Sequence, residues 1–298
     1  MAKSKNNIFT TATKNLQNLR NSKIFKAIIL TTMIISNSPL SAEETYTPTQ
    51  IEDTQRPELD IIVQKEEDSE CAHTLKTLID EIQLTNQYGE YLVSELATNN
   101  TQIIIADTNE KNYYLNNRIY IDVNYIKNAT SAYKKQSLKE TLGHEAVHML
   151  QNKFKIFEKI LSLPPKDGIS LYLLMELDAT MKSYIACDKY YNTNTEERAN
   201  STFNAITNVV NYAMNSYIKK AMLIYKNKTF NPNVPNTKDV IEEFNKMGIF
   251  PKLNLDDIEN KIYNLIPEEY KTQIDTLEQN YIAQGKLLTQ NTMAQKWY

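Results

Sequence analysis

The chain has little of what marks several large classes of protein. Five glycines and nine prolines in 298 residues exclude a collagenous or glycine-rich low-complexity chain. A net charge of −3 leaves no excess of basic residues for binding nucleic acid. No internal repeat is visible, and only two cysteines and three histidines are present. What remains is the composition of an ordinary globular protein, so the few histidines are the residues to place first.

Acidic residues are absent from the first 42 positions, which instead carry six Lys and Arg. An apolar stretch at 27–36 follows them and leads into small side chains that end at Ala42. This order is typical of a secretory signal peptide, because the stretch is much shorter than the about 20 residues of a membrane span. No cysteine lies near Ala42, which argues against a lipid anchor. An uncleaved anchor and an organelle transit peptide are the alternatives.

Cleavage near Ala42 would place the protein in the periplasm or outside the cell. It would also lower the net charge from −3 to −9, which argues against a nucleic-acid partner and against stable association with an anionic membrane. In an oxidising compartment Cys71 and Cys187 are candidates for a disulfide. It would close a loop of 116 residues and contribute about 4–5 kcal/mol. Two separate buried thiols are the alternative.

The remaining sequence predicts an α+β fold that is predominantly helical. β-branched and aromatic runs at 103–105 and 118–123 predict a small antiparallel sheet of two or three strands. Apolar residues at helical spacing precede and follow these runs, and a proline-containing segment at 231–236 marks a boundary. The predicted segments are a signal peptide (1–42), a flexible acidic linker (43–68), a main domain (69–230) and a helical C-terminal region (231–298).

Three helices are predicted in the second half of the main domain. Ser137 and Glu140 form a capping box, so we expect a long helix to begin at Ser137. The proline- and glycine-containing segment 164–168 should end it, and a second helix should run over about 169–190. Apolar residues at helical spacing from 203 to 224 predict a third helix, whose stripe we interpret as core packing and not as a cofactor site.

Two of the three histidines lie in the pattern His144-Glu-Ala-Val-His148, early in the predicted long helix. Four residues advance a helix by about 400°, so both imidazoles project from one face and can bind the same metal ion. This is the HExxH arrangement, in which the histidines hold zinc. Glu145 lies beside them on the helix, in the position of a general base for the attacking water.

The histidines face away from an apolar stripe that predicts the core-facing side of this helix. The members of the stripe are Leu138, Leu142, Ala146, Met149 and Leu150. Gly143, just before the first histidine, disfavours the helix by about 1 kcal/mol and so indicates close approach of another backbone. The alternative interpretation of the motif is a pair of surface histidines stabilised by acidic neighbours.

A third metal ligand has to come from elsewhere in the chain, because catalytic zinc sites have three protein ligands. Glu176 and Asp178 interrupt an apolar helical run, where carboxylates are costly unless they are paired or bind metal. Glu176 follows His148 by 28 residues, enough for a second helix to return beside the first, and is the predicted third ligand. Asp178 is expected either to hydrogen-bond a ligand histidine or to face solvent. The remaining histidine, His73, is expected to be an ordinary helix residue.

These residues resemble the gluzincin branch of the zincin metallopeptidases. Several gluzincin families follow the HExxH motif with a Glu, two spacers and an Ala, as in Glu176-Leu-Asp-Ala179, and the Glu is their third zinc ligand. The run at 144–151 is most similar to an uncharacterised bacterial family classed as metallopeptidase domains. The resemblance implies a zincin-like fold over roughly residues 70–225, with a strand at 119–123 that pairs with an extended peptide substrate. Thr180 departs from the pattern, since many gluzincins have Asp or Asn there.

We therefore expect an exported zinc metallohydrolase, a peptidase that acts on peptide or protein substrates. Zn²⁺ would be held by His144, His148 and Glu176, with Glu145 as the general base. One alternative is a catalytically inactive zincin-like protein that binds metal or peptide without cleaving it. Another is an interaction module in which the acidic segment or the C-terminal helices bind a partner. No pattern identifies a transition-state donor among the nineteen tyrosines.

Overall fold

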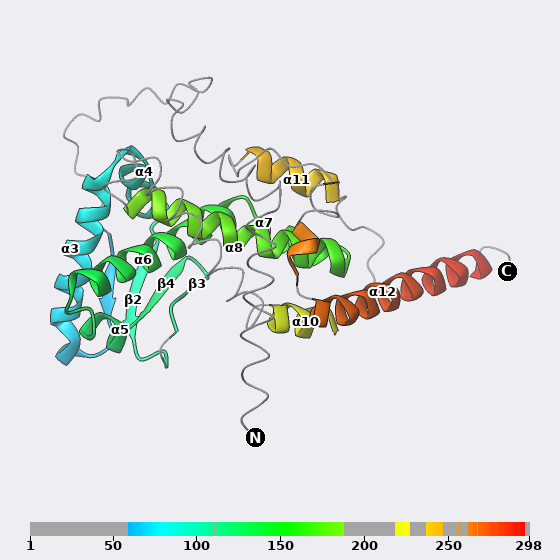
Figure 1. The fold of residues 1–298 in the computed structure, drawn as a ribbon, viewed down its shortest axis with the longest axis horizontal. Coiled ribbons are helices and arrows are strands. Elements are labelled where there is room, and N and C mark those ends of the chain that lie inside the picture. Colours follow the sequence, from blue (N-terminus) through cyan, green and yellow to red (C-terminus); the bar gives the residue numbers. More distant parts are fainter. Residues whose placement is uncertain are drawn as a thin grey trace. The chain divides into compact units, whose positions relative to one another are not determined.

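The structure is a computed structural model and describes residues 59–109, 111–187, 218–226, 237–246, 256, 262–266 and 268–295 (Figure 1). Over these residues the chain is predominantly helical with one small sheet, as the sequence predicts. The predicted signal peptide, the boundary at 231–236 and the apolar stripe up to residue 217 lie outside the described residues. None of the described helices is long and apolar enough to cross a membrane.

The sheet is mixed, and its four strands are arranged in the order β1-β2-β4-β3. The strands are β1 (Ile61–Val63), β2 (Gln102–Ala106), β3 (Tyr113–Leu115) and β4 (Arg118–Asp122). β1, β2 and β4 are parallel, and only β3 is antiparallel to its neighbour β4, so the prediction of an antiparallel sheet was wrong. Two helices connect β1 to β2, as parallel neighbours require. Only β3 and β4 are joined by a tight turn, in which Asn116 and Asn117 both have positive φ.

β1 lies in the segment that the sequence analysis assigned to a flexible linker. Its three residues pair in parallel with residues 103–105 of β2, and the short 3₁₀ helix η1 (Glu66–Asp68) follows. Asp68 is buried and forms an ion pair with Lys127. The end of the acidic segment therefore forms regular secondary structure. Its short apolar run was not predicted as a strand because acidic residues surround it in the sequence.

The helix that carries the HExxH motif begins earlier than predicted. The helices around the sheet are α3 (Ser69–Thr85), α4 (Gln87–Thr98), α5 (Val123–Lys127) and α6 (Ala132–Lys153). The N-cap of α6 is Ser131, whose side chain accepts a hydrogen bond from the N–H of Lys134. The predicted start at Ser137 was wrong, because Ser137 lies inside α6 and its hydroxyl hydrogen-bonds that of Tyr125. α6 packs against β3 and β4, and α3 packs against β1.

The break after α6 also differs from the prediction. α6 ends just before Lys155, which has a left-handed backbone conformation (φ 55°), and α7 (Ile156–Ser162) follows. The second long helix, α8 (Pro165–Cys187), begins at Pro165 and contains Gly168, whereas the sequence analysis placed both residues in the break. Proline is well tolerated at the first position of a helix, where its missing N–H costs no hydrogen bond.

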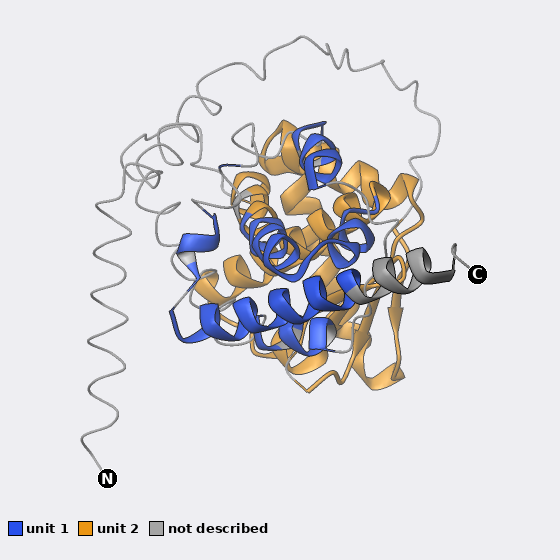
Figure 2. Cartoon of the chain, turned by 90° about the vertical axis from the view of Figure 1, so that its right-hand side faces the viewer, with its two compact units in different colours: residues 1–33, 155–177, 203–298 blue, residues 34–154, 178–202 orange. Residues whose placement is uncertain are grey.

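The chain forms two compact units, and the division between them falls inside α8 (Figure 2). Unit 2 contains the sheet, α3 to α6 and the second half of α8, from Asp178 onward. Its core joins the apolar faces of α3, α4, the sheet and α6 with Ala179, Ala186 and Cys187 of α8. Unit 1 contains α7, the first half of α8, α10 (Ile218–Lys226), α11 (Thr237–Lys246), η4 (Tyr263–Leu265) and α12 (Glu268–Gln295).

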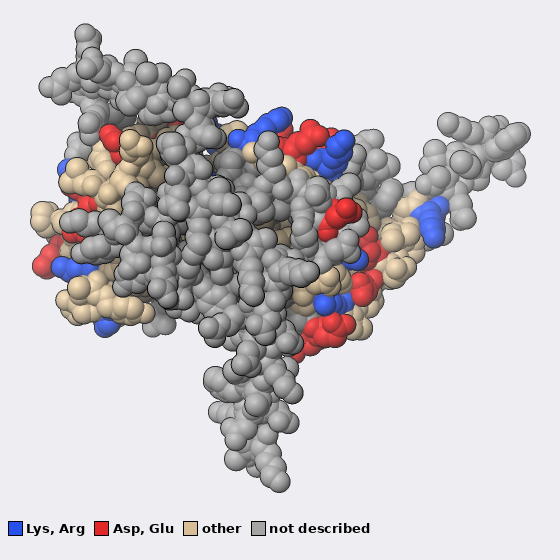
Figure 3. Space-filling model, turned by 45° about the horizontal axis from the view of Figure 1, so that its top comes forward, with Lys and Arg blue, Asp and Glu red and all other residues tan. Residues whose placement is uncertain are grey.

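The structure also shows the state of the two cysteines and, on one face, the distribution of charged side chains. Cys71 and Cys187 are both buried free thiols, so the structure does not contain the predicted disulfide. The thiol of Cys187 instead donates to the carbonyl of Lys139 in α6 at 3.2 Å. On the face shown in Figure 3, acidic and basic side chains of the described residues are interspersed.

Candidate metal centre

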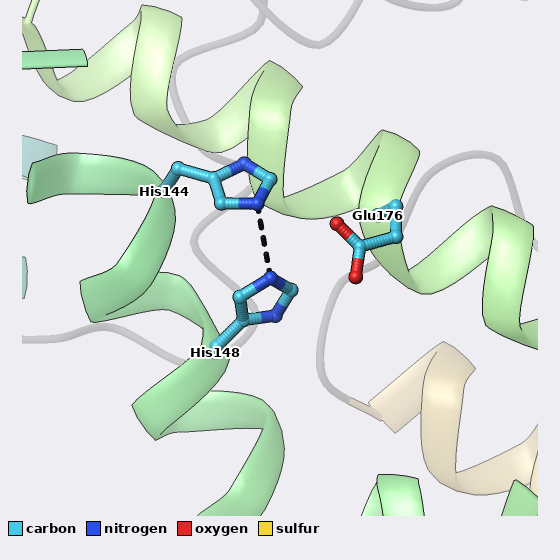
Figure 4. Close-up of side chains that lie close together, drawn as sticks. All are labelled: His144, His148 and Glu176. Atoms are coloured by element: carbon cyan, nitrogen blue, oxygen red, sulfur yellow. Dashed lines mark hydrogen bonds between the residues drawn. The ribbon is translucent and has the colours of Figure 1, made fainter. Parts of the chain in front are cut away.

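α6 presents the two motif histidines on the side opposite its core-facing stripe. Every residue of the predicted stripe is buried, with at most 7% of its surface exposed, so this prediction is confirmed. His144 and His148 are half-buried, and their Nε2 atoms face each other at 3.0 Å (Figure 4). Their rings are nearly perpendicular, with centroids 4.5 Å apart. Helical spacing alone thus brings together two nitrogens that can bind a metal ion.

Helix α8 comes very close to α6 beside the first histidine. A Cβ added to Gly143 would lie 3.1 Å from the Sγ of Cys187 and 3.1 Å from the Cβ of Ser183. The close approach predicted from this glycine is therefore confirmed. Two hydrogen bonds between α6 and α8 accompany it: the Gln136 side chain donates to the carbonyl of Cys187 at 3.3 Å, and the Cys187 thiol donates to the carbonyl of Lys139.

α8 also carries the predicted third ligand. Most of its described side chains are apolar and buried, yet Glu176 and Asp178 are only 4% and 6% exposed. The hydroxyl of Thr180 lies 3.1 Å from the Nδ1 of His144. Glu176 precedes Thr180 by four residues, so the continuous helix places its carboxylate on the same side, one turn away. Figure 4 shows this carboxylate pointing toward the two histidines.

One ligand atom from each of His144, His148 and Glu176 lies within 4.8 Å of the other two, and this group could hold a metal ion. Two nitrogens bound to one tetrahedral zinc ion at 2.0–2.1 Å lie roughly 3.3 Å apart, close to the spacing of the two imidazoles. Two imidazoles and one carboxylate are also the donors of catalytic zinc sites, which keep a fourth position for water or substrate. The donor set therefore fits the predicted metal.

Both histidines are oriented through their second ring nitrogen. The Nδ1 of His148 lies 2.7 Å from the Oε1 of Gln151. An amide oxygen only accepts hydrogen bonds, so this Nδ1 carries the proton and the Nε2 presents a lone pair toward the neighbouring imidazole. The hydroxyl of Thr180 takes the corresponding place at His144. Sequence reasoning did not assign these roles, although Gln151 lies three residues after His148 and Thr180 four after Glu176.

Asp178 reaches the histidines through an intermediate and not by the direct hydrogen bond that was predicted. The Nε2 of Gln151 donates to the Oδ2 of Asp178 at 3.1 Å, and the Nζ of Lys182 lies 3.2 Å from the same oxygen. Burial raises the pKa of the Asp178 carboxyl, whereas the positive charge of Lys182 and the hydrogen bond from Gln151 oppose this rise. The alternative that Asp178 faces solvent was wrong.

The remaining sequence-based assignments have mixed outcomes. Glu145 directly follows His144 in α6 and is 7% exposed. His73 is an exposed residue of α3 and is not part of the metal-ligand group, as expected. The strand at 119–123, expected to pair with substrate, corresponds to β4, which lies between β2 and β3 and is not an edge strand. The edge on that side is β3, whose Tyr114 hydroxyl accepts a hydrogen bond at 3.1 Å from Asn152, four residues after His148.

Comparison with known proteins adds no assignment. No protein-family model, curated protein or solved structure matches the chain. The case for a metal centre therefore rests on the residues and distances described above.

Proposed function

We propose that the protein is an exported zinc-dependent metallohydrolase that cleaves peptide bonds. The observation that carries the proposal is the group formed by His144, His148 and Glu176, with Glu145 between the histidines on the same helix. Three protein ligands of these types leave a fourth position open, which distinguishes catalytic zinc sites from closed structural ones. Export is supported by the basic and apolar order of residues 1–42.

The chemistry assigned to the chain's own residues is proton transfer and orientation. A zinc ion held by the three ligands lowers the pKa of water and polarises a carbonyl group. The Glu145 carboxylate takes a proton from the attacking water and passes it to the leaving amine as the peptide bond breaks. Gln151 and Thr180 hold the imidazoles so that their Nε2 atoms stay directed at the same point.

A peptide substrate is supported by the position of β3. Among the described residues this strand pairs only with β4, and its other side is an edge to which an extended peptide can add main-chain hydrogen bonds. The hydrogen bond between Tyr114 and Asn152 links β3 to α6 one turn beyond His148. An extended chain bound along this edge would therefore run past the metal ligands.

The decisive experiment compares the wild-type chain with a Glu145→Gln variant. We expect purified wild-type protein to contain about one zinc per chain by elemental analysis, as a three-ligand site holds one ion, and to cleave members of a fluorogenic peptide library. Glu145→Gln should keep the zinc and lose activity by about 10²–10⁴-fold, the contribution of a general base. The matched control is Glu140→Gln, which changes a half-buried carboxylate of the same helix and should remain active.

Three results would contradict parts of the proposal. Absence of zinc in the wild type would remove the metal centre, and full activity of Glu145→Gln would remove the assigned base. Bound zinc without hydrolysis of any peptide would favour a zincin-like binding protein. Export is tested separately, since N-terminal sequencing of the exported protein should begin at Glu43.

A further inference from the structure

We propose that Gln151 is a positioning residue that couples the metal ligand His148 to a buried ion pair, Asp178–Lys182, on α8. The inference rests on the proposed function, because it assigns Gln151 a role in metal binding. It goes further in naming one side-chain amide as the connection through which α8 sets the orientation of a ligand on α6.

The connection is a continuous chain of short contacts between buried groups. The Nδ1 of His148 lies 2.7 Å from the Oε1 of Gln151, and the Nε2 of Gln151 lies 3.1 Å from the Oδ2 of Asp178. Lys182 completes the chain with its Nζ 3.2 Å from the same carboxylate oxygen. Gln151 is 1% exposed, and the side chains of Asp178 and Lys182 are 3% and 14% exposed. Water therefore has little access to either end of the amide.

The chemistry of an amide makes this arrangement directional. Its oxygen only accepts hydrogen bonds and its nitrogen only donates them, whereas a carboxylate only accepts. If Gln151 were turned over, its oxygen would face the Asp178 carboxylate and its nitrogen would face a protonated Nδ1 of His148, so both contacts would be repulsive. Asp178 therefore selects one amide orientation, and that orientation selects the His148 tautomer whose Nε2 lone pair is free for metal.

Lys182 lets the carboxylate remain charged in a buried place. An unpaired buried charge is strongly unfavourable, and the i,i+4 spacing on α8 puts Lys182 within reach of Asp178. The amide orientation thus depends on an ion pair that lies within one helix and is connected to His148 through Gln151. Because the chain of contacts passes through Gln151, removing this residue should disconnect Asp178 from metal binding.

The test measures Co²⁺ and Zn²⁺ affinity by chelator competition, together with the visible absorption spectrum of bound Co²⁺, which reports ligand geometry. Gln151→Met keeps the length of the side chain and removes both polar contacts, so affinity should fall by about 10–100-fold, as for other partners of metal-bound histidines. Asp178→Leu removes the acceptor for the Gln151 amide and should cause a smaller loss. In the Gln151→Met background, Asp178→Leu should cause no further loss, because its route to His148 is already broken.

The matched control is Gln136→Met, on the same helix. Gln136 also links α6 to α8, through the carbonyl of Cys187, but it does not contact a histidine. It should leave the affinity and the Co²⁺ spectrum unchanged. Unfolding of each metal-free variant in urea separates loss of folding from loss of positioning, and Asp178→Leu remains informative if Gln151→Met does not fold.

The outcomes separate this inference from the function on which it rests. Wild-type protein that binds neither Co²⁺ nor Zn²⁺ would overturn the proposed metal centre itself. Wild-type binding with unchanged affinity and spectrum in folded Gln151→Met, or in folded Asp178→Leu, would overturn the positioning role alone. Additive losses in the double variant would also overturn it, because they would mean that Asp178 acts by another route.

Discussion

The two halves of α8 use polar contacts for different purposes. In the first half, within unit 1, the backbone N–H of Lys166 donates to the carboxylate of Glu278 in α12 at 2.9 Å. This contact satisfies a helix N-terminus and so joins one helix to another. In the second half, within unit 2, Asp178 contacts Gln151, the partner of His148, and Thr180 contacts His144 directly. Hydrogen bonds thus hold a helix end in the first half of α8 and orient the two histidines in the second half.

The largest expected effect compares a carboxylate assigned to the metal with one assigned to helix packing. Glu176→Gln should weaken Zn²⁺ binding by more than about 100-fold, beyond the loss expected for a residue that only orients a ligand. Glu278→Gln should leave Zn²⁺ affinity unchanged, because its amide oxygen can still accept from Lys166. Competition with a chromogenic zinc chelator measures both. Equal affinities for the wild type and Glu176→Gln would remove Glu176 from the metal centre.

The next effect compares two glycines. Gly168 lies in the first half of α8, and Gly143 lies in α6 against the second half of α8. A Cβ at Gly168 would lie 1.8 Å from the hydroxyl oxygen of the buried Tyr225, which would have to give up its 3.1 Å hydrogen bond to the carbonyl of Ile160. Gly168→Ala should therefore lower the free energy of unfolding by about 1–3 kcal/mol and leave metal affinity unchanged. Urea denaturation and chelator competition measure the two quantities.

Gly143→Ala should instead change metal affinity more than the free energy of unfolding. Its added Cβ would meet α8 at 3.1–3.3 Å, so the helices must separate by only a few tenths of an ångström. The gain in helix propensity, about 1 kcal/mol, offsets this crowding. The free energy of unfolding should change little, whereas Zn²⁺ affinity should fall because Thr180 moves away from His144. Loss of metal affinity in Gly168→Ala but not in Gly143→Ala would reverse the comparison.

The parts of the site that could be predicted are those set by local geometry. Four-residue spacing on a helix places His144 beside His148 whatever the rest of the fold does. Glu176 could be predicted because a carboxylate in an apolar helix needs a partner, and Gly143 because its position in a helix interior is costly without a close neighbour. Each of these inferences depends only on the residues of one or two helices.

What could not be predicted depends on contacts between distant segments. The two predicted strands, β2 and β4, are parallel because β3 lies between them in the chain and pairs with the other side of β4. The additional strand β1 has only three apolar residues, which carry no periodic signal among acidic neighbours. Ser137 and Glu140 have the spacing of a capping box, yet Ser131 caps the helix, because the preceding backbone decides which serine is used. The role of Gln151 could not be predicted, since it depends on where α8 places Asp178.

The smallest expected effect concerns a tyrosine in the helix that packs against the second half of α8. The start of α4 contacts α8 through a hydrogen bond from the Asn86 side chain to the carbonyl of Ile185 at 2.6 Å. Within the described part of the chain, the buried hydroxyl of Tyr88 has no hydrogen-bond partner. Burial, followed by the negative charge of Asp178, raises the pKa of Tyr88 well above its usual range.

Tyr88→Phe should therefore raise the free energy of unfolding, by up to about 1 kcal/mol, because it removes a buried polar group that gains no bond in the folded state. Tyr114→Phe is the matched control, since it deletes a hydroxyl that accepts from Asn152 and should lower the free energy of unfolding by about 0.5–1.5 kcal/mol. Urea denaturation with a chelator present measures both without a contribution from metal. If Tyr88→Phe were as destabilising as Tyr114→Phe, the Tyr88 hydroxyl would have a partner in the folded protein, and the polar network around Asp178 would extend into α4.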